Sequence, residues 1–494
     1  MTIKQWVRRW VPVGAASSLL VASLGVAPAV QAAAAKSVTL SIYLGPLAPT
    51  DSLVKSVANP YPQDALDQLA KAYEKLHPNV HIKVLAQVPM TGNAYTSRED
   101  TWFASHSEPD IIWVQGEAAT LGPEGDLVNL NPYLSQKDPY VPSAPTWADT
   151  LITQGPNLGP QGQQYEVPLD VVATTFYYNQ SILQKAHIHH VPHTLGQLFQ
   201  DSVRIEQAHL PGVYPFYQVS DPLNWWFYGI YGSAIQSNLV KKAYWHGPTS
   251  GPLTPEETAR AVQLKLVTTK SPAIRQVWIW AKKLANYGPP WDTTLVNQQA
   301  DSLFVNGRLA FYWDGNWDYN YLKDAIGHRF AWGTMSLPAV SQQDYPTASP
   351  MPLLGGANNN EAITQNAVTQ HVLPQAVNFL QYLSSPHPDA LLTAQGTGGN
   401  IPNTKGAPVP KSVGGFLKTV LRSKTTGFFD FGIGPNITAP DVQGVLEAYL
   451  KGEISLNTAL SKAETLWLQE NAQTISQNQH GPKSQRWNLK SWTS

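Results

Sequence analysis

The chain has 494 residues, a formal net charge of −1 and 14% charged residues, against about 25% in typical soluble domains. Single hydrophobic cores stop growing well below this length, so the chain is expected to form two or more lobes. The near-neutral charge gives no electrostatic basis for binding DNA, RNA or an anionic membrane. The lack of cysteine excludes disulfides, zinc–thiolate sites, cysteine nucleophiles and a lipid-modified N-terminal cysteine.

The N-terminus has the pattern of a secretory signal peptide. Lys4, Arg8 and Arg9 form a positive segment, an apolar stretch follows at about 11–30, and small residues come next. This order of charge, apolar run and small residues predicts a signal peptide at residues 1–32. An uncleaved membrane anchor is the alternative. We therefore expect an exported chain, either in the periplasm or at the extracellular face of the cell membrane.

The first part of the mature chain predicts an α/β lobe. Residues 38–44 read as a strand, and Asp64 is expected to cap a helix that ends before Pro78. Residues 80–85 and 109–114 then read as two further strands. Strands that alternate with helices in this way predict a mostly parallel sheet.

Further along, residues 171–179 read as another strand, and Thr194 with Gln197 predicts a capping box that opens a helix. A helix is expected from Ser271-Pro272 onward, and Gly452 is expected to separate two helices near the C-terminus. The histidine-rich segment 187–193 invites a metal interpretation. Because no cysteine or clustered carboxylate completes a metal shell there, we expect a solvated loop, no metal and no cofactor.

Taken together, several segments resemble, in the right order, the family 1 extracellular solute-binding proteins of ABC importers, the group of the maltose-binding protein. The segments that carry the resemblance are 72–84, 109–113, 125–134, 165–170, 176–179, 192–198, 304–317, 355–357, 376–386, 399–402 and 449–460. Each is weak alone, but so many matches in order are specific. They span nearly the whole mature chain.

The resemblance implies a two-lobed α/β fold of the type II periplasmic-binding-protein class, with discontinuous lobes, hinge strands between them and a ligand cleft. One lobe would take residues 36–170 plus 338–398, and the other 171–337 plus 399–480, leaving 481–494 as a C-terminal tail. The hinge strands would pass near 169–173, 333–338 and 399–402.

The resemblance also implies a function. The protein would capture a neutral carbohydrate, either a mono- or an oligosaccharide, by hinge closure and deliver it to the permease subunits of an ABC transporter. It would act as a monomer and not as an enzyme. The 17 Trp, 21 Tyr and 13 Phe residues suit either core packing or stacking against sugar faces.

Candidate ligand-binding residues come from two sources. Open α/β sheets bind ligands beyond the carboxyl ends of their strands, which selects Tyr43, Gln115, Glu117 and Asp170. By resemblance, the Trp of a Gly-x-Trp motif is a stacking platform for sugar, and that position here is Trp317. The further candidates are Asn316 and Trp313 near it, the aromatic residues Trp225 and Trp226, and the loop residues Gly355, Gly356 and Asn358.

Two alternatives remain open. The same fold can carry a non-sugar solute such as a glycerol-phosphate, a polyamine or a peptide. A secreted carbohydrate-active enzyme would need two carboxylates flanking the scissile bond. Asp170 and Glu117 are candidates for such a pair, but no catalytic motif surrounds them.

Overall fold

The computed structural model describes residues 37–56, 59, 61–87, 94–114, 117–155, 157–159, 162–217, 220–245, 253–289, 297–349, 355–395, 400–409, 433–435, 440–480 and 487–493. The predicted signal peptide therefore lies outside the described residues. Within these ranges, every helix is either too short or too polar to cross a membrane.

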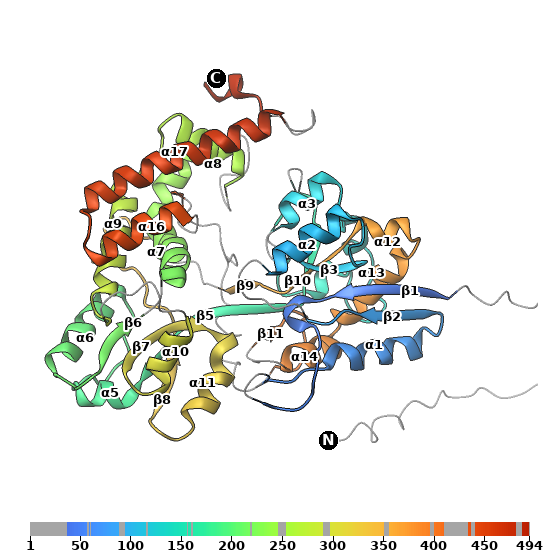
Figure 1. The fold of residues 1–494 in the computed structure, drawn as a ribbon, viewed down its shortest axis with the longest axis horizontal. Coiled ribbons are helices and arrows are strands. Elements are labelled where there is room, and N and C mark those ends of the chain that lie inside the picture. The colour runs from blue at the N-terminus through green and yellow to red at the C-terminus, as the bar shows by residue number, and fades with distance from the viewer. Residues whose placement is uncertain are drawn as a thin grey trace, which may run out of the picture. The chain divides into compact units, whose positions relative to one another are not determined.

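The first sheet has five strands in the order β2-β1-β3-β10-β4 (Figure 1). Its strands are β1 (Val38–Tyr43), β2 (Val80–Val84), β3 (Ile111–Val114), β4 (Glu166–Pro168) and β10 (Asn360–Ile363). β1 pairs in parallel with β2 and β3, whereas β10 runs antiparallel to both β3 and β4. Four of the five strands therefore run in the same direction, which confirms the predicted mostly parallel sheet, and β10 returns from a distant segment to enter it in the opposite direction.

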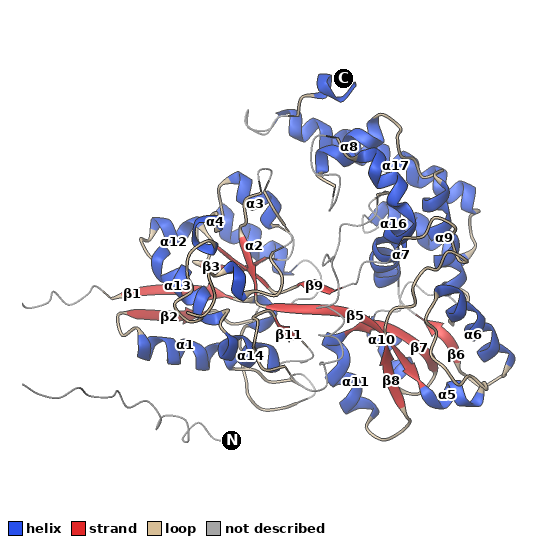
Figure 2. Ribbon diagram, turned by 180° about the vertical axis from the view of Figure 1, so that it is seen from behind, coloured by secondary structure: helices blue, strands red, loops and turns tan. Residues whose placement is uncertain are grey.

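Helices cover this sheet and supply most of its core (Figure 2). Leu66, Leu69 and Tyr73 of the first helix pack on Leu40 and Ile42 of β1. The helices around the sheet are α1 (Ala65–Leu76), α2 (Ala94–Ala104), α3 (Ala118–Glu124), α4 (Asn131–Leu134), α12 (Gln365–Thr369), α13 (Leu373–Leu383) and α14 (Pro386–Ala394), with the 3-10 turns η2 (Gly45–Leu47) and η3 (Ala148–Thr150).

The start of α1 differs from the prediction. Asp64 occupies the N-cap position, but within the described chain its carboxylate makes no capping hydrogen bond. Instead, Oε1 of Gln395 accepts hydrogen bonds from the backbone N–H groups of Asp64 and Ala65, at 2.7 Å each. The cap comes from a residue more than 300 positions away, which no local sequence signal could reveal.

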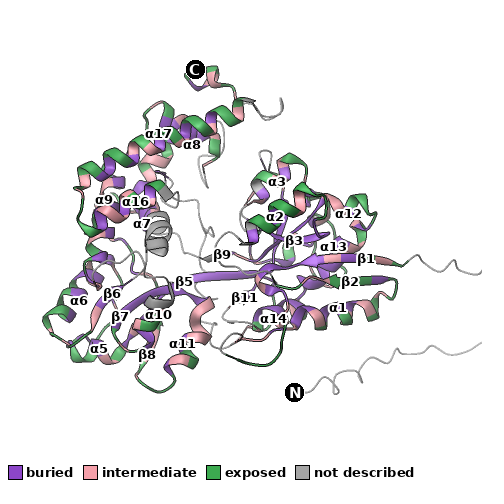
Figure 3. Ribbon diagram, in the orientation of Figure 1, coloured by how far each residue is buried: buried purple, intermediate pink, exposed green. Residues whose placement is uncertain are grey.

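The second sheet is built on β5 (Asp170–Asn179), which is buried along almost its whole length (Figure 3). β5 pairs antiparallel with four strands, and β6 pairs in parallel with β7. The other strands of this sheet are β6 (Tyr214–Tyr217), β7 (Leu309–Gly315), β8 (Trp332–Met335), β9 (Gly355–Ala357) and β11 (Ile401–Pro402).

Most of the helices around the second sheet share one large hydrophobic core with it, and residues 300–305 and 322–326 pack against it in a second, smaller core. The capping box of Thr194 and Gln197 is confirmed, and Gly452 has a φ of 84° between the last two long helices. These helices are α5 (Gln180–Lys185), α6 (Leu195–Gln207), α7 (Ser220–Ala243), α8 (Pro255–Gln263), α9 (Pro272–Ala285), α10 (Asn297–Val305), α11 (Tyr319–Ile326), α16 (Pro440–Lys451) and α17 (Leu456–His480), with η4 (Asn316–Asp318) and η6 (Leu489–Thr493).

Part of the predicted tail is folded. Trp492 in η6 is buried against Ala259 of α8 and Ile475 of α17. Its indole N–H donates to Glu256 at 3.0 Å, and its carbonyl accepts from Arg260 at 3.2 Å. The last turn of the described chain therefore packs on two helices rather than extending into solvent.

Candidate functional site

The end of β7 presents the predicted stacking residue, Trp317. A Cβ atom placed on Gly315 would lie 2.2 to 2.3 Å from ring atoms of Trp317, so the indole lies directly against the glycine backbone. The rest of the Trp317 ring is half-buried and packs on the core of the second sheet. The Gly-x-Trp spacing therefore has a physical reason: the ring folds back two residues onto a position where only glycine leaves room.

The carboxylate of Asp314 holds this turn together. It accepts a hydrogen bond from the Gly315 backbone N–H at 2.6 Å, and it also accepts from the Trp317 indole. Burial raises the pKa of Asp314, and these donors oppose the rise. Trp317 is thus fixed both by a close approach to Gly315 and by a hydrogen bond to Asp314.

Asn316 anchors the same turn to β5. Its side chain is fully buried, and its Oδ1 accepts from the Ala173 backbone N–H at 2.6 Å. On β5, Ala173 and its neighbour Val172 pair with Gly355 and Gly356 of β9. The structure therefore brings Asn316, Gly355 and Gly356 together at one stretch of β5. Asn316 acts there as a structural anchor and not as an exposed ligand contact.

Asp170 begins β5 as a fully buried acceptor. Its carboxylate accepts from the backbone N–H of Asn359 at 2.8 Å, from the Asn359 side chain at 2.6 Å and from the Asn400 side chain. Burial raises the pKa of Asp170 to about 6, although hydrogen bonds from Asn359, Asn400 and Asn358 oppose the rise. In the described structure the Asp170 carboxylate ties three distant asparagines to the crossing strand, and a contact of Asp170 with a ligand stays a prediction.

Asn358 lies on this crossing network. Its backbone N–H donates to the Asp170 carbonyl at 3.2 Å, and its half-buried side chain bonds to the Asp170 carboxylate. As with Asn316, its role in the described structure is to fix β5.

Two aromatic candidates lie in the core. Trp313 is fully buried and stacks on Phe176, with ring centroids 5.3 Å apart. Tyr43 is also fully buried, and it stacks on Tyr95 at 5.7 Å. Both rings therefore pack against aromatic neighbours in the core, and their roles as ligand contacts stay predictions.

Glu117 remains half-exposed just before α3, near several other acids. Burial, with the charge of Glu117 as the next cause, raises the pKa of Glu99 to about 8. Burial also raises the pKa of Glu166 to about 7, with a smaller contribution from Glu117. Glu117 therefore follows the carboxyl end of β3, beside carboxyl groups whose pKa values are raised.

Three candidate ligand-binding residues lie wholly or partly outside the described residues. Gln115 lies outside the described residues. Trp225 and Trp226 belong to α7, but their side chains are also outside the described part of the structure.

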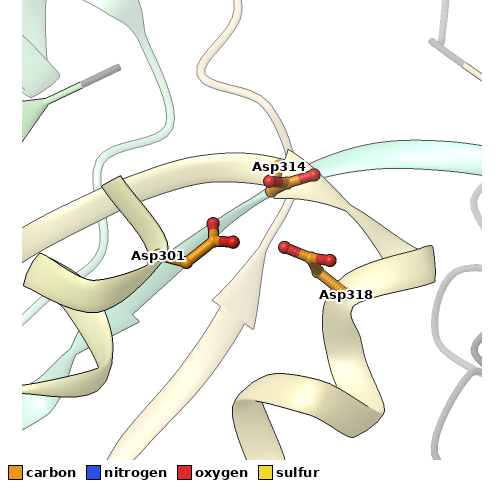
Figure 4. Close-up of side chains that lie close together, drawn as sticks. All are labelled: Asp301, Asp314 and Asp318. Carbon is orange, nitrogen blue, oxygen red and sulfur yellow. The ribbon is translucent and has the colours of Figure 1, made fainter. Parts of the chain in front are cut away.

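Sequence reasoning missed two groups of acids. Glu361 of β10 is fully buried, and neither of its carboxylate oxygens has a hydrogen-bond partner among the described residues, so burial raises its pKa well above the ordinary value. Asp301 and Asp318 lie close to Asp314, with carboxylate oxygens that are all within 4.8 Å of one another (Figure 4). Asp314 and Asp318 are four positions apart in the sequence, but the approach of Asp301 from α10 has no sequence signal.

A family model described as bacterial extracellular solute-binding protein matches residues 59–388, which is well over half of the chain. The chain belongs to this family. Its proteins are extracellular solute-binding proteins of the ABC type, so the members of the family are exported. Among proteins of curated function, none matches the sequence.

Solved structures of other family members are similar over most of the chain. The GacH receptor of Streptomyces glaucescens is 18% identical, with a TM-score of 0.59 over 88% of this chain and 98% of that one. The sugar-binding protein MalE of Xanthomonas citri is 19% identical, with a TM-score of 0.60 over 84% of this chain and 96% of that one. The likeness confirms the predicted fold class, a mixed α/β fold of the two-lobed periplasmic solute-binding proteins.

Proposed function

We propose that the protein captures a neutral carbohydrate, a mono- or oligosaccharide, and delivers it to the permease subunits of an ABC transporter. The observation that carries this proposal is Trp317, a half-buried indole held in one position by Gly315 and Asp314. The C–H face of a sugar packs well on a rigid aromatic surface, and rigidity lowers the entropy lost on binding.

Several of the similar structures support a sugar as the ligand. GacH was solved in complex with acarbose, a protein named RafE with raffinose, and another is described as a chitin oligosaccharide binding protein. Their identities to this chain are 15–18%, so they support the class of ligand and leave the individual sugar open.

Glu117, with Gln115 beside it in sequence, is the candidate for hydrogen bonds to sugar hydroxyls at the carboxyl end of β3, and Trp225 or Trp226 is a second aromatic candidate. We retain the predicted lobes, 36–170 plus 338–398 and 171–337 plus 399–480, and hinge closure between them as the binding motion. We also retain a monomer and cleavage of a signal peptide at residues 1–32.

The rival pairing of Asp170 with Glu117 as the two carboxylates of a glycosidase has little support. Asp170 is fully buried and already bonded to Asn359 and Asn400, so it has no free oxygen to present to a substrate.

The test is a thermal-shift screen of the mature chain against neutral sugars, followed by calorimetry with the best ligand. A ligand at about 100 times its dissociation constant stabilises a protein by about 2.7 kcal/mol. We expect a raised melting temperature, recovery of the sugar intact, and a large loss of affinity in Trp317→Ala. Cleavage of the sugar would favour the enzyme, and an unchanged affinity in Trp317→Ala would refute the site.

A further inference from the structure

Three carboxyl groups from three different elements point at one another near the turn that carries Trp317. Asp301 comes from α10, Asp314 from the end of β7 and Asp318 from η4 (Figure 4). All three groups have an oxygen within 4.8 Å of the others. We call Asp301, Asp314, Asp318 and the neighbouring Tyr312 the carboxyl cluster.

The hydrogen bonds of the carboxyl cluster require more protons than its phenol can supply. The Tyr312 hydroxyl is bonded to both Asp301 and Asp314, and Asp314 is bonded to Asp318. An ionised carboxylate can only accept, and a phenol has a single proton to donate. Tyr312 is the donor in both of its bonds, so its one proton is shared between Asp301 and Asp314. The bond between Asp314 and Asp318 therefore requires a further proton, which must reside on a carboxyl group.

The surroundings favour the protonated forms. Burial raises the pKa of Asp301 to about 7, with the charge of Asp314 as the next cause. Burial also raises the pKa of Asp318 well above its ordinary range. No described Lys, Arg or His side chain is among the groups that shift the pKa values of the three acids.

The neighbouring elements present phenols to this cluster. Arg329 lies close enough to lower the pKa of Tyr321, but its guanidinium donates to the carbonyl groups of Ala325 and Ile326. The phenols that interact electrostatically with the cluster acids are Tyr177 of β5, Tyr321 of α11, and Tyr61.

The cluster is connected directly to the proposed sugar platform. Asp314 accepts from the Trp317 indole, and Asp318 is the next residue after Trp317 in the same 3-10 turn. Loss of the shared protons would place like charges within 4.8 Å of one another. Such charges repel strongly in a buried setting, so the turn that holds Trp317 would open.

We propose that the carboxyl cluster makes ligand binding pH-dependent: its shared protons hold Trp317 in the binding position in acid, and their loss at higher pH releases the ligand. The inference rests on the proposed function and specifies its regulation. The carboxyl pKa values are raised on folding, so the stabilisation is complete below the unfolded pKa, about 4. It is lost as the pH rises toward the pKa of about 7 shown by Asp301.

The experiment compares three proteins by calorimetry with the best sugar, between about pH 4.5 and pH 8. In Asp318→Asn, the amide donates to Asp314 at every pH. Glu453→Gln removes an exposed acid from the loop between α16 and α17 and is the matched control. Asp301→Asn replaces Asp318→Asn if that variant does not fold.

We expect the dissociation constant of the wild-type protein to rise across this range by roughly tenfold for each carboxyl pKa that binding shifts by one unit. The Asp318→Asn profile should be flatter, while Glu453→Gln should match the wild type. A pH-independent affinity in the wild-type protein would overturn the inference. Tight binding restored at pH 8 by millimolar calcium would also overturn it, because a cation would then have replaced the protons.

Melting temperatures without sugar separate this inference from the proposed function. If no sugar binds at any pH, the proposed function fails. The proton sharing is then tested by the dependence of the melting temperature on pH without sugar. A melting temperature that falls as the pH rises in the wild type, and changes less with pH in Asp318→Asn, supports it. Equal profiles refute it.

Discussion

The indole of Trp317 lies on the backbone of Gly315, so closely that a Cβ atom on Gly315 would be 2.2 Å from Cζ3 of the ring. This contact explains why the proposed platform needs both residues of the motif. Glycine is required at position 315 because it has no side chain. Its backbone angles are extended ones that any residue can adopt.

Gly315→Ala should therefore displace Trp317 and weaken sugar binding while the fold persists. Overpacking of a close contact costs about 1–3 kcal/mol. Calorimetry with the best sugar measures the affinity, and circular dichroism checks the fold. Gly444→Ala is the control, because a Cβ atom on Gly444 of α16 would meet no described atom within 4 Å. Equal affinities in the two variants would contradict the role of Gly315.

Asp170→Ala should destabilise the crossing strand. It removes the acceptor of three hydrogen bonds from Asn359 and Asn400. Hydrogen bonds to a charged group contribute about 1.5–3 kcal/mol each, though not additively. Urea denaturation should show a loss of at least that amount from the free energy of unfolding. A loss below about 0.5 kcal/mol, the level of an ordinary surface substitution, would show that the network is not holding β5.

Gln395→Ala should cost about 1 kcal/mol, the usual effect of removing a helix N-cap. Oε1 of Gln395 is the acceptor for the first N–H groups of α1. The comparison is Gln68→Ala, which removes only an exposed side-chain bond to Asp64 at 2.7 Å. Denaturation midpoints decide between them, and an equal effect of the two variants would argue against capping by Gln395.

Glu99→Gln should flatten the dependence of stability on pH. Burial raises the pKa of Glu99 from 4.5 to about 8. The folded protein therefore holds a proton that the unfolded chain has lost across this window, so stability falls as the pH rises from about 4.5 to about 8. The glutamine variant lacks this contribution. Melting temperatures across the window test the change, with the exposed Glu124→Gln as the control. A profile as steep as that of the wild type would exclude Glu99 as a source of the slope.

Local patterns predicted much of the secondary structure. Apolar and polar residues that alternate predicted β1 and β2, and apolar residues at helical spacing predicted α1 and α9. The predicted capping box at Thr194 is also present. The antiparallel entry of β10 into the first sheet could not be predicted, because its four residues pair with segments about 190–250 positions earlier.

The site was harder to predict than the fold. A motif located Trp317, but strand alternation could not show that Trp313 packs in the core, because every residue of β7 is buried. From the sequence, Asp170 is a candidate ligand contact. Its bonds to asparagines beyond residue 357 could not be predicted, because those residues approach Asp170 only in the folded chain. The carboxyl cluster depends on Asp301, whose approach exists only after folding.

β5 has a consequence for how the chain reaches its folded state. This strand, at residues 170–179, pairs with segments that begin at 309, 332, 355 and 401. Pairings of such sequence separation form slowly, because a long loop must close before any contact compensates for the lost entropy. The central strand of the second sheet cannot complete its pairings until residue 402 is available. The second sheet therefore stays incomplete until most of the chain has been synthesised.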